Sequence, residues 1–413
     1  MGYRFLRFSP VYAGYIYQFL SKIPDHESLS YEELYKKFIQ TRYSTSDFYE
    51  RNLKEHGNEV QQFYSSVEFF QKAWARDNSV SFRTNNWYKD IIISQVIQYQ
   101  PDIIFLNDIY KINRDVRNEI REAYDKNVII IGSLTAYTND FASFNDLDLM
   151  ITGVPSFYEN FTKAGCNAYF MPFAFEKTLL NEITRQKTPD IDFAFMGSLG
   201  NGIDNFSLRY ALIDDLLKNT PITVWGDIED KRLSGFDMTA LNYSYKINKM
   251  MNFFRISTDI RKKIPFIRLA ANCVLDPNYP ALNTIYPDRI HRPIFGLEYY
   301  SAMANSKIVL NVHHGENSSK FAANMRLFEA TGTGTCLITD WKENLSTLFE
   351  PDTEVVTYRD ATECIKKVKY LLENPAEREA IAKAGQQRTL KDHTYELRMA
   401  EINKEINKLL SKK

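Results

Sequence analysis

Short apolar runs alternate with helical stretches along much of the chain, a pattern typical of βα units built around parallel sheets. A helix with apolar residues at helical spacing is expected over Trp87–Tyr99. It should end there because Pro101 restricts the conformation of the residue before it. The strands expected in this half are Tyr3–Phe8, Glu59–Phe63, Ile103–Leu106, Val128–Ile131, Leu147–Thr152 and Ala168–Met171. We therefore predict one doubly wound domain that ends near Glu176.

A polar stretch of mixed charge, Lys177–Asp190, separates this half from a second series of strands. A buried strand is predicted at Asp192–Met196, followed by a Gly-rich turn and a helix over Ser207–Leu217. Further strands are expected at Pro221–Trp225, Ile308–Val312 and Cys336–Thr339. The charged tail Ala376–Lys413 is expected to be helical. The second half therefore repeats the architecture of the first.

The length and composition indicate a globular protein with two domains. At 413 residues the chain exceeds what one ordinary hydrophobic core supports. Hydrophobic residues make up 44% of it and charged residues 25%, as in folded rather than disordered proteins. We predict an α/β fold with Rossmann-like doubly wound domains at residues 1–180 and 190–385 and a C-terminal helix at 386–413.

The charge and the cysteine content limit which kinds of partner and which cell compartment we expect. The net charge of −1 argues against a nucleic-acid partner held by bulk electrostatics. No apolar run reaches the length of a membrane span, and Met1-Gly2-Tyr3-Arg4 does not resemble a signal peptide. The four cysteines are scattered, with no CxxC pair, which fits reduced thiols. We expect a cytoplasmic protein.

Residues 228–286 form a predicted helical insertion in the second domain. Between residues 245 and 268, lysines and arginines are interleaved with tyrosine, methionine and phenylalanine. The simpler expectation is an extra helical pair packed on the second domain. The alternative is a basic amphipathic surface that contacts an anionic acceptor or makes a peripheral contact with the inner face of the membrane.

In open α/β sheets, ligands bind at the carboxyl ends of the strands, and this rule selects three loops of the second domain. Gly197 and Ser198 begin a Gly-rich loop, reaching Gly202, in which the backbone can approach a phosphate. Trp225 and Gly226 end the next strand, where they can line a nucleotide base. The third loop begins with His313, His314 and Gly315.

The segment Asn324–Asp340 predicts a short helix, a glycine stop and a buried strand. A helix N-terminus can hold a phosphate through its unpaired N–H groups and its partial positive charge. Arg326 could add charge-assisted bonds to a diphosphate. Lys320 and the capping Asn324 could complete this phosphate-binding site. Glu329 is an acceptor suited to a pair of ribose hydroxyls. The alternative is an ordinary capped helix with an Arg326–Glu329 pair.

Loops of the first domain offer residues for an acceptor. Tyr12 and Gly14 follow the first strand, and Gly14 would permit close approach of a ligand. Asn107 and Asp108 end the strand Ile103–Leu106, and Ser133 follows another strand. Asp108 is the best-placed carboxylate for a general base, although carboxylates after strands often cap the next helix instead.

Two patterns could suggest a metal site. Asp146-Leu147-Asp148 is a D-x-D sequence, but it precedes the apolar residues of its strand and so lies at the wrong end of the sheet; we expect a solvated strand entry. His313 and His314 are adjacent, so they cannot both face the same way. We predict no metal.

Several segments resemble GT-B glycosyltransferases, specifically the group-1-like branch that includes spore-maturation (CgeB-like) proteins. The resemblance is carried by NMRLFEATGTGTCLITD from Asn324, YRFLRFSPVYAGYIYQFL from Tyr3, LKEHGNEV, QPDIIFLND, the FNDLDLMITGVPSFYENFTKAGCNAYFMPFAFE stretch, DFAFMGSLG and SKIVLNVHHG. Together they match in order over most of the chain except about residues 228–286.

The resemblance implies two Rossmann-like domains facing across a cleft, with the last helix crossing back to the first domain. It places the Gly197 loop beside a donor diphosphate and Arg209 on the helix that follows. Family members with a fuller E-x7-E pattern would carry Glu where this chain has Phe321. The donor-binding residues expected on these grounds are Gly197, Ser198, Arg209, Trp225, Gly226, His313, Lys320, Asn324, Arg326, Leu327 and Glu329.

The expected function is metal-independent transfer of a sugar from a UDP-, GDP- or dTDP-sugar to a glycan, protein or lipid-linked acceptor. One alternative is a nucleotide-sugar epimerase or hydrolase of the same fold. The other is a non-catalytic binding protein associated with the envelope or spore.

Overall fold

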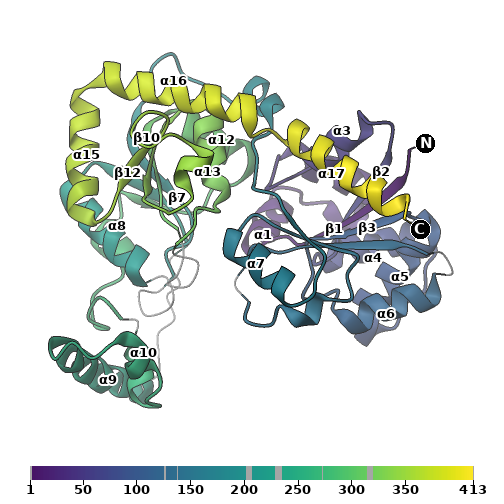
Figure 1. Ribbon diagram of the computed structural model, residues 1–413, viewed down its shortest axis with the longest axis horizontal. Coiled ribbons are helices and arrows are strands. Elements are labelled where there is room, and N and C mark those ends of the chain that lie inside the picture. Colours follow the sequence, from purple (N-terminus) through teal and green to yellow (C-terminus); the bar gives the residue numbers. More distant parts are fainter. Residues whose placement is uncertain are drawn as a thin grey trace. The chain divides into compact units, whose positions relative to one another are not determined.

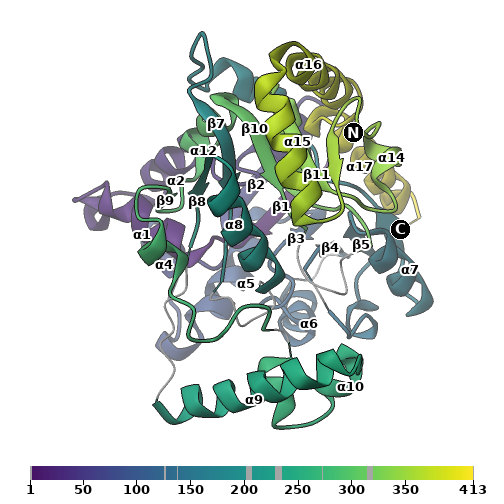
Figure 2. The ribbon, with the colours of Figure 1, turned by 90° about the vertical axis from the view of Figure 1, so that its left-hand side faces the viewer.

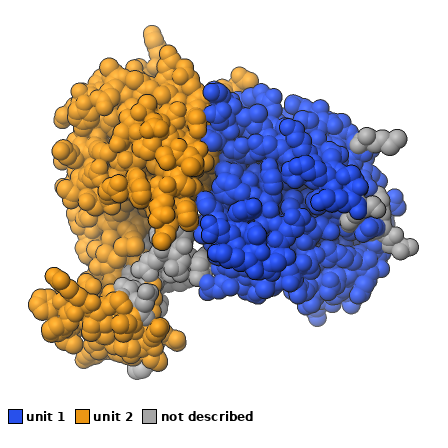
Figure 3. Space-filling view, in the orientation of Figure 1, with its two compact units in different colours: residues 1–179, 295–297, 390–413 blue, residues 180–294, 298–389 orange. Residues whose placement is uncertain are grey.

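The computed structural model describes residues 2–124, 127–136, 138–200, 207–227, 235–271, 273–313 and 320–412. Its chain divides into two compact units, coloured separately in Figure 3. Unit 1 comprises residues 1–179, 295–297 and 390–413, and unit 2 comprises residues 180–294 and 298–389. Asn201, Gly202, His314, Gly315 and part of the 228–286 insertion lie outside the described residues.

Unit 1 is built on a six-stranded parallel sheet with the order β2-β1-β3-β4-β5-β6. Its strands are β1 (Arg4–Ser9), β2 (Glu59–Tyr64), β3 (Ile103–Leu106), β4 (Ile129–Ser133), β5 (Leu149–Thr152) and β6 (Ala168–Phe170). All four residues of β3 are buried, because a central parallel strand is covered on both faces. This explains why the strand reads in the sequence as an uninterrupted apolar run.

Helices cover both faces of this sheet (Figure 1). They are α1 (Ala13–Ser21), α2 (Tyr31–Gln40), α3 (Phe48–Lys54), α4 (Glu68–Asp77), α5 (Trp87–Tyr99), α6 (Arg114–Ala123), α7 (Pro155–Lys163) and α17 (Tyr395–Leu410). The start of α2 is held by a capping box between Ser30 and Glu33. Helices α17 and α3 pack together, so the last helix of the chain belongs to the first unit, as the resemblance implied.

Unit 2 has a second six-stranded parallel sheet, with the order β12-β11-β10-β7-β8-β9. Its strands are β7 (Ile191–Met196), β8 (Ile222–Trp225), β9 (Ile290–His291), β10 (Ser306–Asn311), β11 (Cys336–Asp340) and β12 (Val356–Tyr358). The larger helices are α8 (Ser207–Asn219), α9 (Gly235–Phe253), α12 (Gly296–Ala304), α13 (Met325–Gly332), α15 (Ala361–Glu373) and α16 (Pro375–Asp392). Helices α8 and α15 lie together on one face of the sheet, with α13 on the other (Figures 1 and 2).

The core of unit 2 lies where α8 and α15 meet this sheet. Phe193, Phe195, Ile308, Leu310 and Ile338 are all fully buried in it. Phe195 is the last but one residue of β7, so this core extends to the edge of the sheet where the strands end. The same edge carries the candidate site.

Most of the predicted elements are confirmed within one or two residues, and β3 and α5 have the predicted bounds. The sequence analysis missed β9 and β12, which have only two and three residues. The described part of the insertion is helical. It consists of α9, α10 (Thr258–Lys262), the 3-10 turn η5 (Ile267–Ala270) and α11 (Leu282–Ile285).

Candidate functional site

Four neighbouring strands of unit 2, β11, β10, β7 and β8, end at one edge of the sheet because they are parallel. Gly197 follows β7, Gly226 follows β8 and His313 lies just beyond β10. Along the chain, helix α13 follows β10 and precedes β11. The fold therefore gathers at one edge most of the donor-site residues that the sequence analysis chose.

Arg326, in the first turn of α13, reaches across the ends of β7 and β10. One terminal nitrogen donates to the carbonyl of Met196, and Nη1 donates to Asn311 Oδ1 at 3.2 Å. Its guanidinium lies 5.0 Å from the centre of the Phe195 ring. Its Nε is buried and has no hydrogen-bond partner within the described ranges. The side chain is therefore held over the strand ends.

Arg209 approaches the same edge from α8. Its Nη1 and Nη2 donate to the carbonyls of Ser198 and Val312, each at 2.9 Å. Its guanidinium also lies near the Phe195 ring, at 5.9 Å. Burial, and to a smaller extent the positive charge of Arg326, lower the pKa of Arg209 to about 10. The site thus brings two cations together at some electrostatic cost.

Two glycines permit this close packing. A Cβ at Gly197 would lie 2.7 Å from Nη2 of Arg326, and a Cβ at Gly226 would lie 2.4 Å from the carbonyl oxygen of Gly197. Side chains at these positions would push the guanidinium and the neighbouring strand end away. Both glycines are therefore required by contacts within unit 2, whatever the ligand.

Asn324 occupies the N-cap position of α13, but the expectation that its side chain caps the helix is wrong. Its Nδ2 donates instead to Asn311 Oδ1 at 3.0 Å and to the carbonyl of Val312 at 3.2 Å. These bonds fix the start of the helix against the end of β10. Because the side chain makes no capping bond, it does not cover the helix N-terminus in the usual way.

Glu329 is buried and lies against two tyrosines of α12. Its carboxylate accepts hydrogen bonds from the hydroxyls of Tyr299 at 2.7 Å and Tyr300 at 3.3 Å. Burial raises its pKa, while these bonds and the charge of Arg326 act in the opposite direction. The sequence analysis missed both tyrosines. The Arg326–Glu329 ion pair, which was the alternative reading of this helix, is not among the ion pairs of the described residues; Glu329 accepts from the two tyrosines instead.

His313 is held by Asp340, which in turn pairs with Lys342; the sequence analysis chose neither of these two residues. Asp340 Oδ1 lies 2.6 Å from His313 Nδ1, and Asp340 Oδ2 lies 2.9 Å from Lys342 Nζ. Burial would raise the pKa of Asp340, but His313 and Lys342 outweigh it and lower this pKa to about 2. The Nε2 atom of His313 is buried and has no hydrogen-bond partner in the described part of the chain. Asp340 ends an apolar strand, and that signal could have identified it.

The remaining donor-site candidates differ in accessibility. Trp225 is half-buried, and its ring lies 5.6 Å from that of His291, which the sequence analysis also missed. Lys320 is exposed, whereas Leu327 is fully buried. Any ligand contact of Leu327 would therefore involve its backbone.

The acceptor-side candidates lie in unit 1. Asp108 is buried, and its Oδ2 accepts bonds from Ser65 Oγ at 2.9 Å and from the Tyr88 hydroxyl at 3.2 Å. Burial raises its pKa, which suits a group that must take up a proton. Asn107 Oδ1 accepts a bond from the buried Arg7 at 2.8 Å.

Tyr12 and Ser133 belong to other loops of unit 1. Tyr12 is 48% exposed and precedes α1, and a Cβ at Gly14 would lie 2.8 Å from its ring. Ser133 lines a small cavity with Tyr395 and Arg398. Their roles as acceptor-side residues stay predictions.

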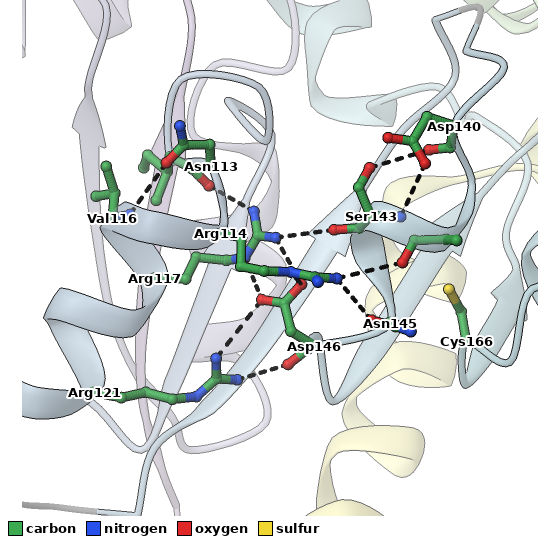
Figure 4. A network of polar contacts seen from close by, with 12 residues as sticks. Asn113, Arg114, Val116, Arg117, Arg121, Asp140, Ser143, Asn145, Asp146 and Cys166 are labelled. Carbon is green, nitrogen blue, oxygen red and sulfur yellow. Dashed lines mark hydrogen bonds and ion pairs between the residues drawn. The ribbon is translucent and has the colours of Figure 1, made fainter.

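Asp146, the first acid of the D-x-D sequence, is held by arginine side chains, so the expectation of a solvated strand entry is wrong (Figure 4). Asp146 receives bonds of 2.7 and 2.8 Å from the buried Arg117 and one of 3.2 Å from Arg114. Burial would raise its pKa, but these arginines keep it below the usual value. Asp148 accepts a bond from the backbone of Ile130 at 2.7 Å. Both acids hold the entry of β5 by structural contacts.

Two features are absent from the described residues. They contain no group of three or more His, Cys, Asp and Glu side chains placed to hold a metal ion. Within the same ranges, none of the helices has both the length and the apolar content needed to cross a membrane.

Two α/β units, each built on a six-stranded parallel sheet, are typical of the two-domain glycosyltransferases known as GT-B, and the comparisons agree. Residues 177–404 match the family described as glycosyl transferase-like, and the chain belongs to this family. A search of curated proteins found no match. The chain is therefore a glycosyltransferase with the GT-B fold, as predicted.

Solved structures of this fold cover almost the whole chain. A glycosyltransferase from Rickettsia africae is 10% identical, with a TM-score of 0.55, over 99% of both chains. The Anabaena protein HepE in complex with UDP-glucose is 11% identical, with a TM-score of 0.55, over 98% of this chain and 100% of its own. An alpha-glucosyltransferase in complex with UDP-glucose and DNA is 11% identical, with a TM-score of 0.58, over 98% of this chain and 100% of its own. At these identities the likeness shows the fold.

Proposed function

We propose that the protein transfers a sugar from a nucleotide-sugar donor, and that unit 2 binds this donor at the edge formed by β7, β8, β10 and α13. The observation that carries the proposal is the pair Arg209 and Arg326. Their charges are close enough that Arg326 lowers the pKa of Arg209. A diphosphate placed against them would remove this repulsion and gain charge-assisted hydrogen bonds.

The other residues of this edge have roles that follow from their positions. The start of α13 and the Gly197 loop supply backbone N–H groups to the diphosphate. His313, oriented by Asp340, directs its unoccupied Nε2 toward the same anion. Trp225 and Gly226 line the base, and Glu329 accepts from the ribose hydroxyls. Arginines and helix N–H groups offset the charge that develops on the leaving diphosphate, so we propose that transfer needs no metal.

Unit 1 presents the acceptor through Tyr12, Gly14, Asn107 and Ser133, and Asp108 accepts its proton. The raised pKa of Asp108 supports this role. The acceptor is a glycan, protein or lipid-linked molecule, and the enzyme works in the cytoplasm. The ordered motifs support a place in the group-1-like branch that resembles CgeB-like proteins.

A screen of UDP-, GDP- and dTDP-sugars by thermal shift tests donor binding. A ligand at about 100 times its Kd stabilises the state that binds it by about 2.7 kcal/mol, which should raise the midpoint of the binding unit by about 5–10 °C. No shift with any nucleotide would contradict the proposal. Consumption of donor without an acceptor would indicate an epimerase or hydrolase instead.

A transfer assay with EDTA tests the metal-free mechanism separately. We expect the rate to be unchanged. Complete loss of activity that Mg²⁺ restores would overturn metal independence while leaving donor binding intact.

A further inference from the structure

Helix α9 buries polar side chains as well as apolar ones and exposes several large apolar side chains. Ser244 and Asn248 are buried, and the side chains of both donate to the carbonyl of Ile267 in η5, at 3.0 and 2.6 Å. Large apolar side chains point to solvent instead. The exposed ones are Tyr243 at 61%, Met250 at 56%, Phe253 at 82% and Phe254 at 67%. The spacing of Tyr243, Met250 and Phe253 places them on one face of the helix, and Phe254 follows directly after its end.

Two exposed phenylalanines, Phe253 and Phe254, lie where the helix ends. The rings of Phe253 and Phe254 lie 5.4 Å apart and nearly perpendicular. Arg255 then adopts a left-handed conformation, with φ of 58°, and the chain turns toward α10. Two exposed phenylalanines at such a turn form a compact apolar tip. Exposed apolar groups of this kind mark interaction surfaces.

The segment that carries the tip is rich in positive charge. Residues 235–271 contain seven lysines and arginines but only two aspartates. Lys249 and Arg255 are exposed beside the two phenylalanines in the sequence, and Lys263 and Arg268 are exposed in the segment that follows. The Lys246 ammonium lies 5.9 Å from the Tyr243 ring on the apolar face itself. The surface thus combines accessible aromatic rings with accessible cations.

We propose that this face of α9 docks on an anionic lipid surface, with Phe253 and Phe254 entering the headgroup region and Lys249 and Arg255 contacting lipid phosphates. An anionic bilayer complements both parts of the surface, because it accepts apolar side chains and attracts basic ones without a matching shape. The inference does not depend on the donor or on the proposed chemistry of the site.

Vesicle sedimentation of the full chain tests the proposal. We expect the protein to pellet with vesicles of phosphatidylcholine and phosphatidylglycerol, to remain in solution with phosphatidylcholine alone, and to be released by salt. Phe253→Glu should lower the partition coefficient between vesicles and water about tenfold or more, because a charge replaces the aromatic ring that enters the headgroup region. Lys249→Glu combined with Arg255→Glu should lower it about 30-fold or more.

Two control variants match these changes elsewhere on the chain. Ile97→Glu alters an exposed apolar residue of α5, and Lys366→Glu with Lys369→Glu reverses two exposed charges of α15. Both should pellet as the wild type does. The proposal is overturned if the wild type does not pellet with anionic vesicles, or if it pellets with neutral vesicles as well as with anionic ones. It is also overturned if the α9 variants pellet no less than the controls.

Discussion

Replacing Arg326 by methionine should separate donor binding from folding. The variant loses the guanidinium's bonds to Met196 and Asn311, and a hydrogen bond to a charged group contributes about 1.5–3 kcal/mol. It also loses the positive charge that lowers the pKa of Arg209, which offsets part of this loss. Methionine can still cover the Phe195 ring. We therefore expect the free energy of unfolding to fall by about 3 kcal/mol or less.

The same variant should also bind the ligand more weakly. A hydrogen bond between a guanidinium and a phosphate contributes about 1.5–3 kcal/mol. Losing one such bond should raise the Kd of a nucleoside diphosphate about 10- to 150-fold. Arg326→Lys keeps the charge but not the planar fork of donors, so its Kd should fall between those of the wild type and Arg326→Met.

Calorimetric titration of the full chain measures these changes, with the nucleoside diphosphate that stabilises the protein most in the thermal screen. Arg359→Met is the matched control, because Arg359 is exposed in the same unit and stacks on Trp341 at 4.5 Å. It should bind as the wild type does. If Arg326→Met folds normally and also keeps the wild-type affinity, the reasoning about the arginine pair is refuted.

Three further predictions follow from contacts in unit 2. Because His313 and Lys342 hold the pKa of Asp340 down to about 2, its carboxylate should stabilise the fold above about pH 4 by about 2 kcal/mol and lose this effect as pH falls toward 2. Urea unfolding at several pH values should show this loss in the wild type but not in Asp340→Asn. Gly197→Ala should displace the Arg326 guanidinium and weaken nucleotide binding about tenfold in the same titration, and unchanged affinity would exclude the predicted clash. Glu329→Gln should weaken the binding of a ribonucleotide about tenfold but not the binding of its 2′,3′-dideoxy analogue. An equal loss of affinity for both would exclude a bond between Glu329 and the ribose hydroxyls.

Apolar patterns predicted every strand of the first sheet and four of the six strands of the second. Ile103–Leu106 and Trp87–Tyr99 were predicted with their observed bounds, because each is long or apolar enough to be recognised locally. The strands β9 and β12 were missed, since two or three residues carry no period. Their positions depend on neighbouring strands rather than on their own residues.

The residues at the candidate edge of unit 2 were predictable where they directly follow a buried strand, and not where they come from another element. Gly197, Gly226 and His313 were found by that rule. Tyr299 and Tyr300 were missed because they reach Glu329 from a different helix. Asp146 was misread as solvated because its arginine partners lie about 30 residues away in the sequence, a separation that local patterns do not show.

Photoaffinity labelling of the full chain tests donor binding by unit 2 most directly. An azido-substituted nucleoside diphosphate should label peptides from residues 191–227 and 306–340, and excess unlabelled nucleotide should abolish the labelling. Labelling confined to peptides from residues 1–179, with none in unit 2, would contradict the account.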